Sequence, residues 1–156
     1  MNLIIDKIVE IFQENLIGRN IRTYRVGNPT DIGKSQLPMV YVQALSETVT
    51  ALDSSHDIKE MEIQIGVIVD PAMEYGKHKR VQENAGDRLL MEIVSGRNTD
   101  NTPMTNTVSY ILRHNWTMDG VTFYQEDRTM YGVREEPEAF YKEVHFFVKA
   151  KCSVTI

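Results

Sequence analysis

The sequence predicts an α+β fold in which two main helices pack on one face of a mostly antiparallel sheet. Two alternating strands and two amphipathic helices indicate this class. In the last thirteen residues, apolar side chains occupy every second position: Val144, Phe146, Val148, Ala150, Cys152, Val154 and Ile156. A mid-chain segment alternates in the same way: Met61, Ile63, Ile65, Val67 and Val69. Because successive side chains of a strand point to opposite faces, each segment reads as a strand with one buried face.

The first predicted element is an amphipathic helix. Apolar residues follow helical spacing over residues 3–16, and Gly18 stands where a left-handed residue commonly ends a helix. A short strand is expected over residues 21–26, and the glycine- and proline-containing segment 27–33 predicts a loop. Because the helix carries a single apolar stripe, one sheet face is expected to be covered and the other left to water or to a partner.

A hairpin is expected next. Residues 39–45 are β-branched and aromatic enough for a strand, and residues 59–69 form the alternating mid-chain strand. The intervening residues 46–57 are mostly small and polar, which predicts a long hairpin loop. Loops of this length inside a compact domain are often functional or ordered by a partner, although a disordered excursion explains the composition equally well.

The second half of the chain repeats the order of helix and then strands. A second amphipathic helix is expected over residues 77–95, ended by Gly96. Residues 108–112 fit a short helix or a strand equally well, and we favour the strand. A further strand is expected over residues 121–124, with an extension to residue 131 left open, and an acidic loop is expected over 135–138 before the terminal strand. The strand pairs at both ends of the chain are most easily antiparallel.

Length and composition indicate one α+β domain over residues 1–156. A chain of this size buries roughly 68 to 70% of its unfolded surface, so a core can form without disulfides or metals. The single cysteine, Cys152, excludes an internal disulfide and is expected to be a small buried hydrophobe in a chain made in a reducing cytosol. No apolar run approaches the roughly 20 residues that cross a bilayer, so no membrane partner is expected.

The acidic balance of the chain bears on nucleic acids. Its formal net charge is −5 and its pI is about 5.4, which argues against tight binding to phosphates. An acidic surface does suit a passage through which DNA slides without sticking.

No residue pattern indicates a chemistry. The four histidines, His56, His78, His114 and His145, are scattered, and no metal or cofactor is expected. The sequence contains no G-x-S-x-G turn, no G-x-G-x-x-G motif and no P-loop, so no catalytic residue is proposed. Glu62 and Asp70 near the ends of one strand leave a small metal-dependent hydrolase as a minor alternative.

Two segments suggest contacts with other proteins. One is the expected loop at residues 46–57. The other is residues 119–141, where aromatic residues and methionine are interleaved with arginine and carboxylates. Aromatic residues, methionine and arginine are enriched at protein interfaces, although core packing accounts for about half of these side chains.

The order and lengths of these elements resemble the tail-terminator proteins of long-tailed bacteriophages. The resemblance rests on the opening helix that ends at Gly18, the strand 39–45 with the loop after it, and the strand 60–70. It continues through the helix 77–95, a strand around 121–128 and the terminal strand 144–156, so it spans nearly the whole chain.

The resemblance implies a structural protein of the virion tail or neck rather than an enzyme. Such a protein forms a hexameric ring that caps the tail tube, ends tube polymerisation and meets the head-side connector protein, while genome DNA passes through the lumen without sequence recognition. Ring contacts of this kind are heterologous and head-to-tail. We expect the ring or tube contacts to come from the following residues: Thr48, Leu52, Asp53, His56, Asp127, Arg128, Tyr131, Arg134, Glu135 and Glu136.

Other functions remain open at this stage. A neck or head-completion connector protein shares the size, acidity and oligomeric habit of a terminator. A monomeric regulatory binding module is a third possibility, which the mass of the chain in solution distinguishes from a ring.

Overall fold

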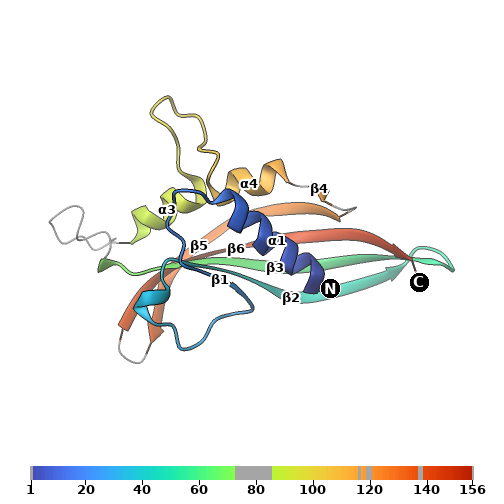
Figure 1. The fold of residues 1–156 in the computed structure, drawn as a ribbon. Helices are drawn as coiled ribbons and strands as arrows, with labels where there is room; N and C mark the ends of the chain where they lie inside the picture. The colour runs from blue at the N-terminus through green and yellow to red at the C-terminus, as the bar shows by residue number, and fades with distance from the viewer. Residues whose placement is uncertain (1, 73–85, 116, 119–120, 137–138, 156) are drawn as a thin grey trace.

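A computed structural model describes residues 2–72, 86–115, 117–118, 121–136 and 139–155. In these residues, helices cover one face of a six-stranded sheet whose strand order is β1-β2-β3-β6-β5-β4 (Figure 1). The elements in chain order are α1 (Asn2–Asn15), β1 (Thr23–Val26), the 3₁₀ turn η1 (Lys34–Gln36), β2 (Met39–Ala51), β3 (His56–Val69), α3 (Asp87–Ser95), α4 (Val108–His114), β4 (Thr117–Met118), β5 (Val121–Glu136) and β6 (Ala139–Thr155).

The α+β class and the largely antiparallel sheet are confirmed. Among the described strands, every pair is antiparallel except β1 with β2, which run parallel. The described residues hold three α-helices, α1, α3 and α4, where the sequence indicated two main ones. Of the predicted helix at 77–95, the structure describes residues 86–95, in which α3 begins at Asp87 and is followed by Gly96; residues 77–85 lie outside the description.

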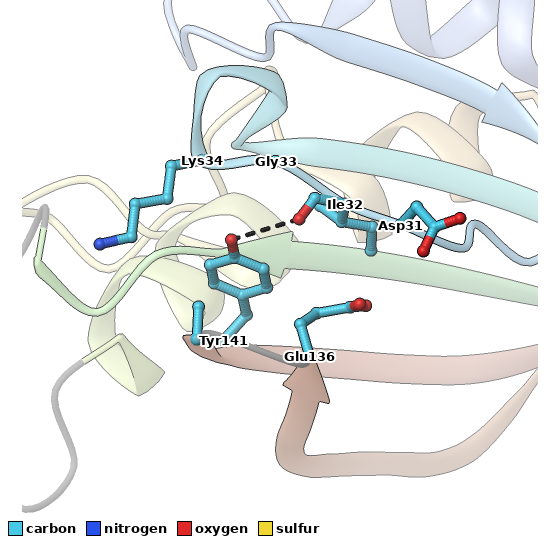
Figure 2. Close-up of a pocket in the computed structure, with 7 residues that line it drawn as sticks. Asp31, Ile32, Gly33, Lys34, Glu136 and Tyr141 are labelled. Atoms are coloured by element: carbon cyan, nitrogen blue, oxygen red, sulfur yellow. Dashed lines mark hydrogen bonds between the residues drawn. The ribbon is translucent and has the colours of Figure 1, made fainter.

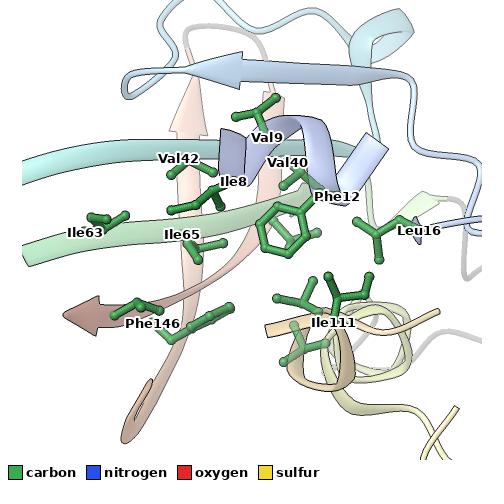
Figure 3. Packing of buried hydrophobic residues seen from close by; sticks show 14 of the residues in the cluster. Ile8, Val9, Phe12, Leu16, Val40, Val42, Ile63, Ile65, Ile111 and Phe146 are labelled. Atoms are coloured by element: carbon green, nitrogen blue, oxygen red, sulfur yellow. The ribbon is translucent and has the colours of Figure 1, made fainter. Parts of the chain in front are cut away.

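The main core lies between the helices and the sheet, as the alternating patterns predict. Figure 3 shows Ile8 and Phe12 of α1 packed over Val42 of β2 and Ile65 of β3. Phe12 and Ile65 are completely buried. Fully burying side chains of this size contributes roughly 1.5 to 3 kcal/mol each, so this layer is the main source of stability.

The terminal strand behaves as its alternation predicts, and it is longer than expected. β6 begins at Ala139, and its buried side chains on the helix side include Val144, Phe146, Val148 and Ala150. Burial decreases toward the end of β6. Cys152 is only partly buried there, whereas the sequence predicted a buried side chain. All of β6 from Lys142 to Thr155 pairs with β3, so the two most regular strands of the sequence lie at the centre of the sheet.

The predicted long loop at residues 46–57 is wrong. β2 continues to Ala51 and β3 begins at His56, so only residues 52–55 form the turn. The polar composition misled the prediction, because both faces of this part of β2 are exposed and no apolar alternation marks it. The run Thr48-Val49-Thr50 is nevertheless β-branched, which favours an extended backbone.

The strand expected at residues 108–112 is also wrong, because these residues belong to helix α4. The Thr107 hydroxyl caps the helix by accepting a hydrogen bond from the Tyr110 backbone N–H at 3.4 Å. Val108 and Ile111, three residues apart, are both buried against the main core. Spacing of three therefore describes this segment better than alternation does.

The predicted acidic loop at 135–138 is shorter than expected. Glu135 and Glu136 are the last residues of β5, paired with Phe140 and Ala139 of β6, and residues 137–138 lie outside the description. Cross-strand pairing therefore overrides the turn-like composition at this point.

The face of the sheet away from the helices is not simply left to water. The segment between β1 and β2 crosses it on the side opposite to the helices (Figure 1). A second apolar cluster forms beneath this segment: Ile32, Leu37, Met39, Tyr41, Ile68 and Tyr141. None of the described helices combines the length and hydrophobicity that crossing a bilayer requires.

Candidate functional site

The first expected contact segment, residues 46–57, and the later part of the second, from residue 129 onward, lie at opposite ends of the sheet. Thr48 of β2 pairs with Glu60 of β3. Tyr131 of β5 pairs with Val144 of β6, which in turn pairs with Val67 of β3. The seven residues from Glu60 to Val67 correspond to roughly 23 Å along the strand. In Figure 1 the turn between β2 and β3 lies beside the C-terminus, and the β5–β6 hairpin ends at the other side of the molecule.

The first surface, here called the distal hairpin, consists of residues 44–56. Every residue of β2 from Ala44 to Ala51 is exposed, Thr48 included. Leu52, at the turn, exposes 59% of its surface, and Val49 exposes 50%. The hairpin therefore presents apolar side chains to its surroundings on the exposed part of β2.

The turn of the distal hairpin is held by Asp53. Its carboxylate accepts hydrogen bonds from the Ser55 backbone N–H at 2.8 Å and the Ser55 hydroxyl at 3.1 Å, and lies 3.1 Å from Nδ1 of His56. The Ser55 N–H, followed by His56, lowers the pKa of Asp53. Serine and aspartate both contact the same ring nitrogen of His56, so the three side chains lack the geometry of a catalytic triad, which uses both nitrogens.

The second surface, here called the proximal hairpin, consists of residues 129–136 of β5 and 139–142 of β6. Tyr131, Val133 and Phe140 expose 43%, 55% and 66% of their surfaces. All three lie on the helix side of the sheet, because Tyr131 pairs with buried Val144 and the other two follow at even spacing in the ladder. Glu135, exposed, pairs with Phe140.

Two of the expected contact residues fall at an irregular point of β5. The ladder between β5 and β6 shifts register between Gln125 and Thr129. Asp127 and Arg128 lie within this shift, and the description does not extend to their side chains.

Arg134 is turned inward rather than presented to a partner. Its Nε donates to Oε2 of Glu143 at 2.9 Å and its Nη2 to Oε1 at 3.1 Å, which makes the ion pair bidentate. The same guanidinium donates to the Pro29 carbonyl at 3.1 Å and to the Asn28 side chain at 2.7 Å. Arg134 therefore ties the segment after β1 to the proximal hairpin.

Tyr41 completes this network. Its hydroxyl donates to Glu143 and accepts a hydrogen bond from Nε2 of Gln64 at 3.0 Å. Burial, followed by the bonds to Glu143, raises the pKa of Tyr41 well above its usual range, so the phenol stays protonated. Sequence reasoning singled out Arg134 but missed its partners, because Tyr41, Gln64 and Glu143 come from β2, β3 and β6 and only the strand register brings them together.

Glu136 lines a pocket of about 470 Å³ at the end of the proximal hairpin (Figure 2). Tyr141 forms its centre and donates a hydrogen bond to the Ile32 carbonyl at 3.3 Å. In Figure 2, Lys34 lies on one side of the Tyr141 ring, and Asp31 and Glu136 lie on the other. The pocket can receive a polar group of either charge, and nothing in its lining selects one chemistry.

The residues of the hydrolase alternative do not converge. Glu62 lies within β3 and Asp70 follows its end, eight residues and roughly 26 Å further along an extended chain. No group of three histidine, cysteine or carboxylate side chains gathers within the part of the chain that the structure describes.

The geometry of the described residues thus offers two exposed apolar surfaces at opposite ends of one sheet, an internal ion-pair network and a shallow mixed pocket. The one serine–histidine contact described on these surfaces, Ser55 with His56, shares its ring nitrogen with Asp53 and lacks the arrangement of a triad. No protein-family model matches the chain, and no curated protein is significantly similar to it.

Proposed function

We propose that this chain is the tail-terminator protein of a long-tailed bacteriophage. In this role it forms a hexameric ring on the end of the tail tube, stops tube polymerisation and joins the tail to the head-side connector. The proposal rests on the order of elements described above and on one geometric observation: the distal and proximal hairpins are different surfaces at opposite ends of the sheet.

Two different surfaces on one chain are what a heterologous contact requires. If one copy's distal hairpin meets the next copy's proximal hairpin, every copy uses both surfaces and the assembly closes when the rotation closes. Leu52 and Phe140 supply exposed apolar area for such contacts. Isolated exposed apolar residues are common on monomers, but two clusters at opposite ends are less easily explained in that way.

The charge of the chain supports the same role. A net charge of −5 disfavours phosphate binding, so DNA can pass through a ring of such subunits without being held. The protein acts as a structural part of the virion, made in the host cytoplasm, and performs no catalysis.

The test is tube assembly in the presence of the chain. Tail-tube protein is polymerised with and without the purified chain, and tube lengths and tube ends are measured by electron microscopy. The proposal expects shorter, uniform tubes that carry a ring at one end. Tubes of unrestricted length with bare ends contradict it, and a chain that binds the head connector but not the tube indicates a neck protein instead.

Matched variants localise the effect. Leu52→Asp and Phe140→Asp place a charge on each surface and should abolish capping. Ile17→Asp is the control, because Ile17 exposes 72% of its surface and lies on neither hairpin. Capping that survives both hairpin variants, or that fails equally with the control, contradicts the assignment of the two surfaces.

A further inference from the structure

Within the residues that the structure describes, the sheet has two unpaired edge segments of equal length at different places. Among the described strands, β1 covers β2 only from Met39 to Val42, which leaves the outer edge of residues 44–51 unpaired. β4 covers β5 only at Val121 and Thr122, so no described strand pairs with the outer side of residues 129–136. These two segments are here called the β2 edge and the β5 edge.

Neither edge carries lysine or proline, two common protections against pairing, although the β5 edge ends in the charged residues Arg134, Glu135 and Glu136. Natural edge strands are commonly blocked by lysine, proline or short length. The β2 edge contains no lysine, arginine or proline, and the β5 edge contains no lysine or proline. The β2 edge has one bulge between Ala44 and Ser46, after which its ladder is regular to Ala51. Beyond this bulge, the β2 edge is a regular strand with exposed Val49 and with backbone groups on its outer side that no described strand pairs, so a further strand can pair with it.

We propose that copies of this chain join by adding the β2 edge of one copy to the β5 edge of the next, so that one sheet continues across the subunit boundary. The inference deepens the proposed function and rests on its self-association. The occupant is a second copy because this chain supplies both edges and because their directions and faces agree.

The directions agree because three antiparallel steps separate the two strands. β2, β3, β6 and β5 alternate in direction, so β2 and β5 run opposite ways within one chain. A second copy placed beside the first with its strands in the same direction therefore brings its β2 antiparallel to the first copy's β5. The short outer strands leave room for this pairing. β1 covers β2 only before the β2 edge begins, and β4 covers β5 only before the β5 edge begins, at opposite ends of the sheet.

The faces agree as well. Val49 pairs with Lys59, which lies on the same face of β3 as buried Met61, and Tyr131 pairs with buried Val144. Both side chains therefore lie on the helix side of a continued sheet. In the antiparallel register that overlaps the two edges fully, Val49 stands opposite Tyr131, and Thr48 stands opposite Gly132 on the other face. Pairs of an aromatic with a β-branched residue are among the favourable cross-strand neighbours.

Pairing of these edges sets the tilt of the strands in an assembly. Val49 and Tyr131 lie at the levels of Lys59 and Val67 on β3, which are eight residues and roughly 26 Å apart. Four strand spacings separate equivalent edges of neighbouring copies, or roughly 19 Å. A ring closes only if the strands tilt by about 50° against its axis, somewhat more than in typical closed barrels. A smaller tilt gives a helical filament.

The test is disulfide crosslinking between two separately purified variants. In a Cys152→Ser background, tagged Val49→Cys chain is mixed with untagged Tyr131→Cys, Gly132→Cys or Val133→Cys chain and oxidised. The mixed dimer should form with Tyr131→Cys, or with Val133→Cys if the register shifts by two, and should be lost with Gly132→Cys. Gly132 is a matched control, because a Cβ there meets no atom within 4 Å and would point to the opposite face.

Several outcomes overturn the inference: no mixed dimer with any variant, equal crosslinking through Gly132→Cys, or Val49→Cys chains that crosslink mainly with one another. Circular dichroism and thermal melting of each variant exclude misfolding as the cause. If crosslinking succeeds through residue 131 or 133 and fails through residue 132, but the chains form a filament, the result supports this pairing and contradicts the terminator role. If closed rings cap the tubes but crosslinking does not follow this dependence on residue, the result overturns this pairing and leaves the proposed function standing.

Discussion

The replacement of Gly66 by alanine tests how tightly the second face of the sheet is packed. Gly66 lies in β3 between Tyr41 and His145. A Cβ at this position would come within 2.2 Å of two ring carbons of Tyr41 and 2.5 Å of its hydroxyl. Tyr41 cannot simply move aside, because it is completely buried and its hydroxyl is held by Glu143 and Gln64.

The expected cost has two parts. Overpacking a filled core costs roughly 1 to 3 kcal/mol, and loss of a hydrogen bond to a charged group costs roughly 1.5 to 3 kcal/mol. Because relief of the clash breaks the bond to Glu143, we expect Gly66→Ala to lower the free energy of unfolding by about 3 to 5 kcal/mol. Equilibrium urea unfolding measures this change.

Two comparisons make the result specific. Gly132→Ala, on the same face of the sheet, should change stability by less than about 0.5 kcal/mol, because no atom lies within 4 Å of the added Cβ. In a double-mutant cycle, Tyr41→Val should cost much less in the Gly66→Ala chain than in the natural one, because the ring that clashes is already gone. A Gly66→Ala chain as stable as the Gly132→Ala chain, or additive effects in the cycle, would refute the reasoning.

Three further predictions concern other parts of the fold. Glu143→Gln leaves the Arg134 guanidinium without its charge partner and should destabilise the chain by about 2 to 4 kcal/mol in urea unfolding; an unchanged midpoint contradicts the internal role of the pair. Phe12→Ala empties a fully buried site under α1 and should cost about 3 to 5 kcal/mol, seen as a lower Tm; a change under about 1 kcal/mol argues against that packing. The pKa of Asp53 is lowered in the folded chain, so its stabilisation of the turn is complete above the ordinary aspartate pKa and is lost as pH falls through the lowered value. The NMR shift of the Ser55 amide should follow that titration in acid and lose this acid transition in Asp53→Asn; an acid transition that persists in Asp53→Asn contradicts it.

Local patterns predicted the elements whose stability is local or one-faced. The alternation in β3 and β6 and the helical spacing in α1 each bury one face against one layer, so periodicity alone located them. Gly18 has φ +80°, the left-handed conformation expected after a helix. Short or two-sided elements were missed: the distal half of β2 is exposed on both faces, and α4 is only two turns long.

The candidate site was predictable only in part. The sequence singled out both regions as contact candidates, residues 46–57 for the length of the expected loop and residues 119–141 for their aromatic, methionine and arginine content, and their contact role stays a prediction. It gave no sign that Arg134 turns inward, because its partner Glu143 is nine residues away and meets it only across the β5–β6 ladder. The parallel pairing of β1 and the crossing of the segment after it likewise depend on contacts between distant parts of the chain.

The central claim is that two different surfaces on this chain join copies head-to-tail into a closed ring on a tail tube. Native mass spectrometry of the full chain, titrated with short tail-tube segments, measures this directly. The account predicts a single complex in which a fixed, hexameric set of chains is bound to each segment and further chain adds nothing. Chains that stay monomeric on the tube, or that add without limit, contradict it.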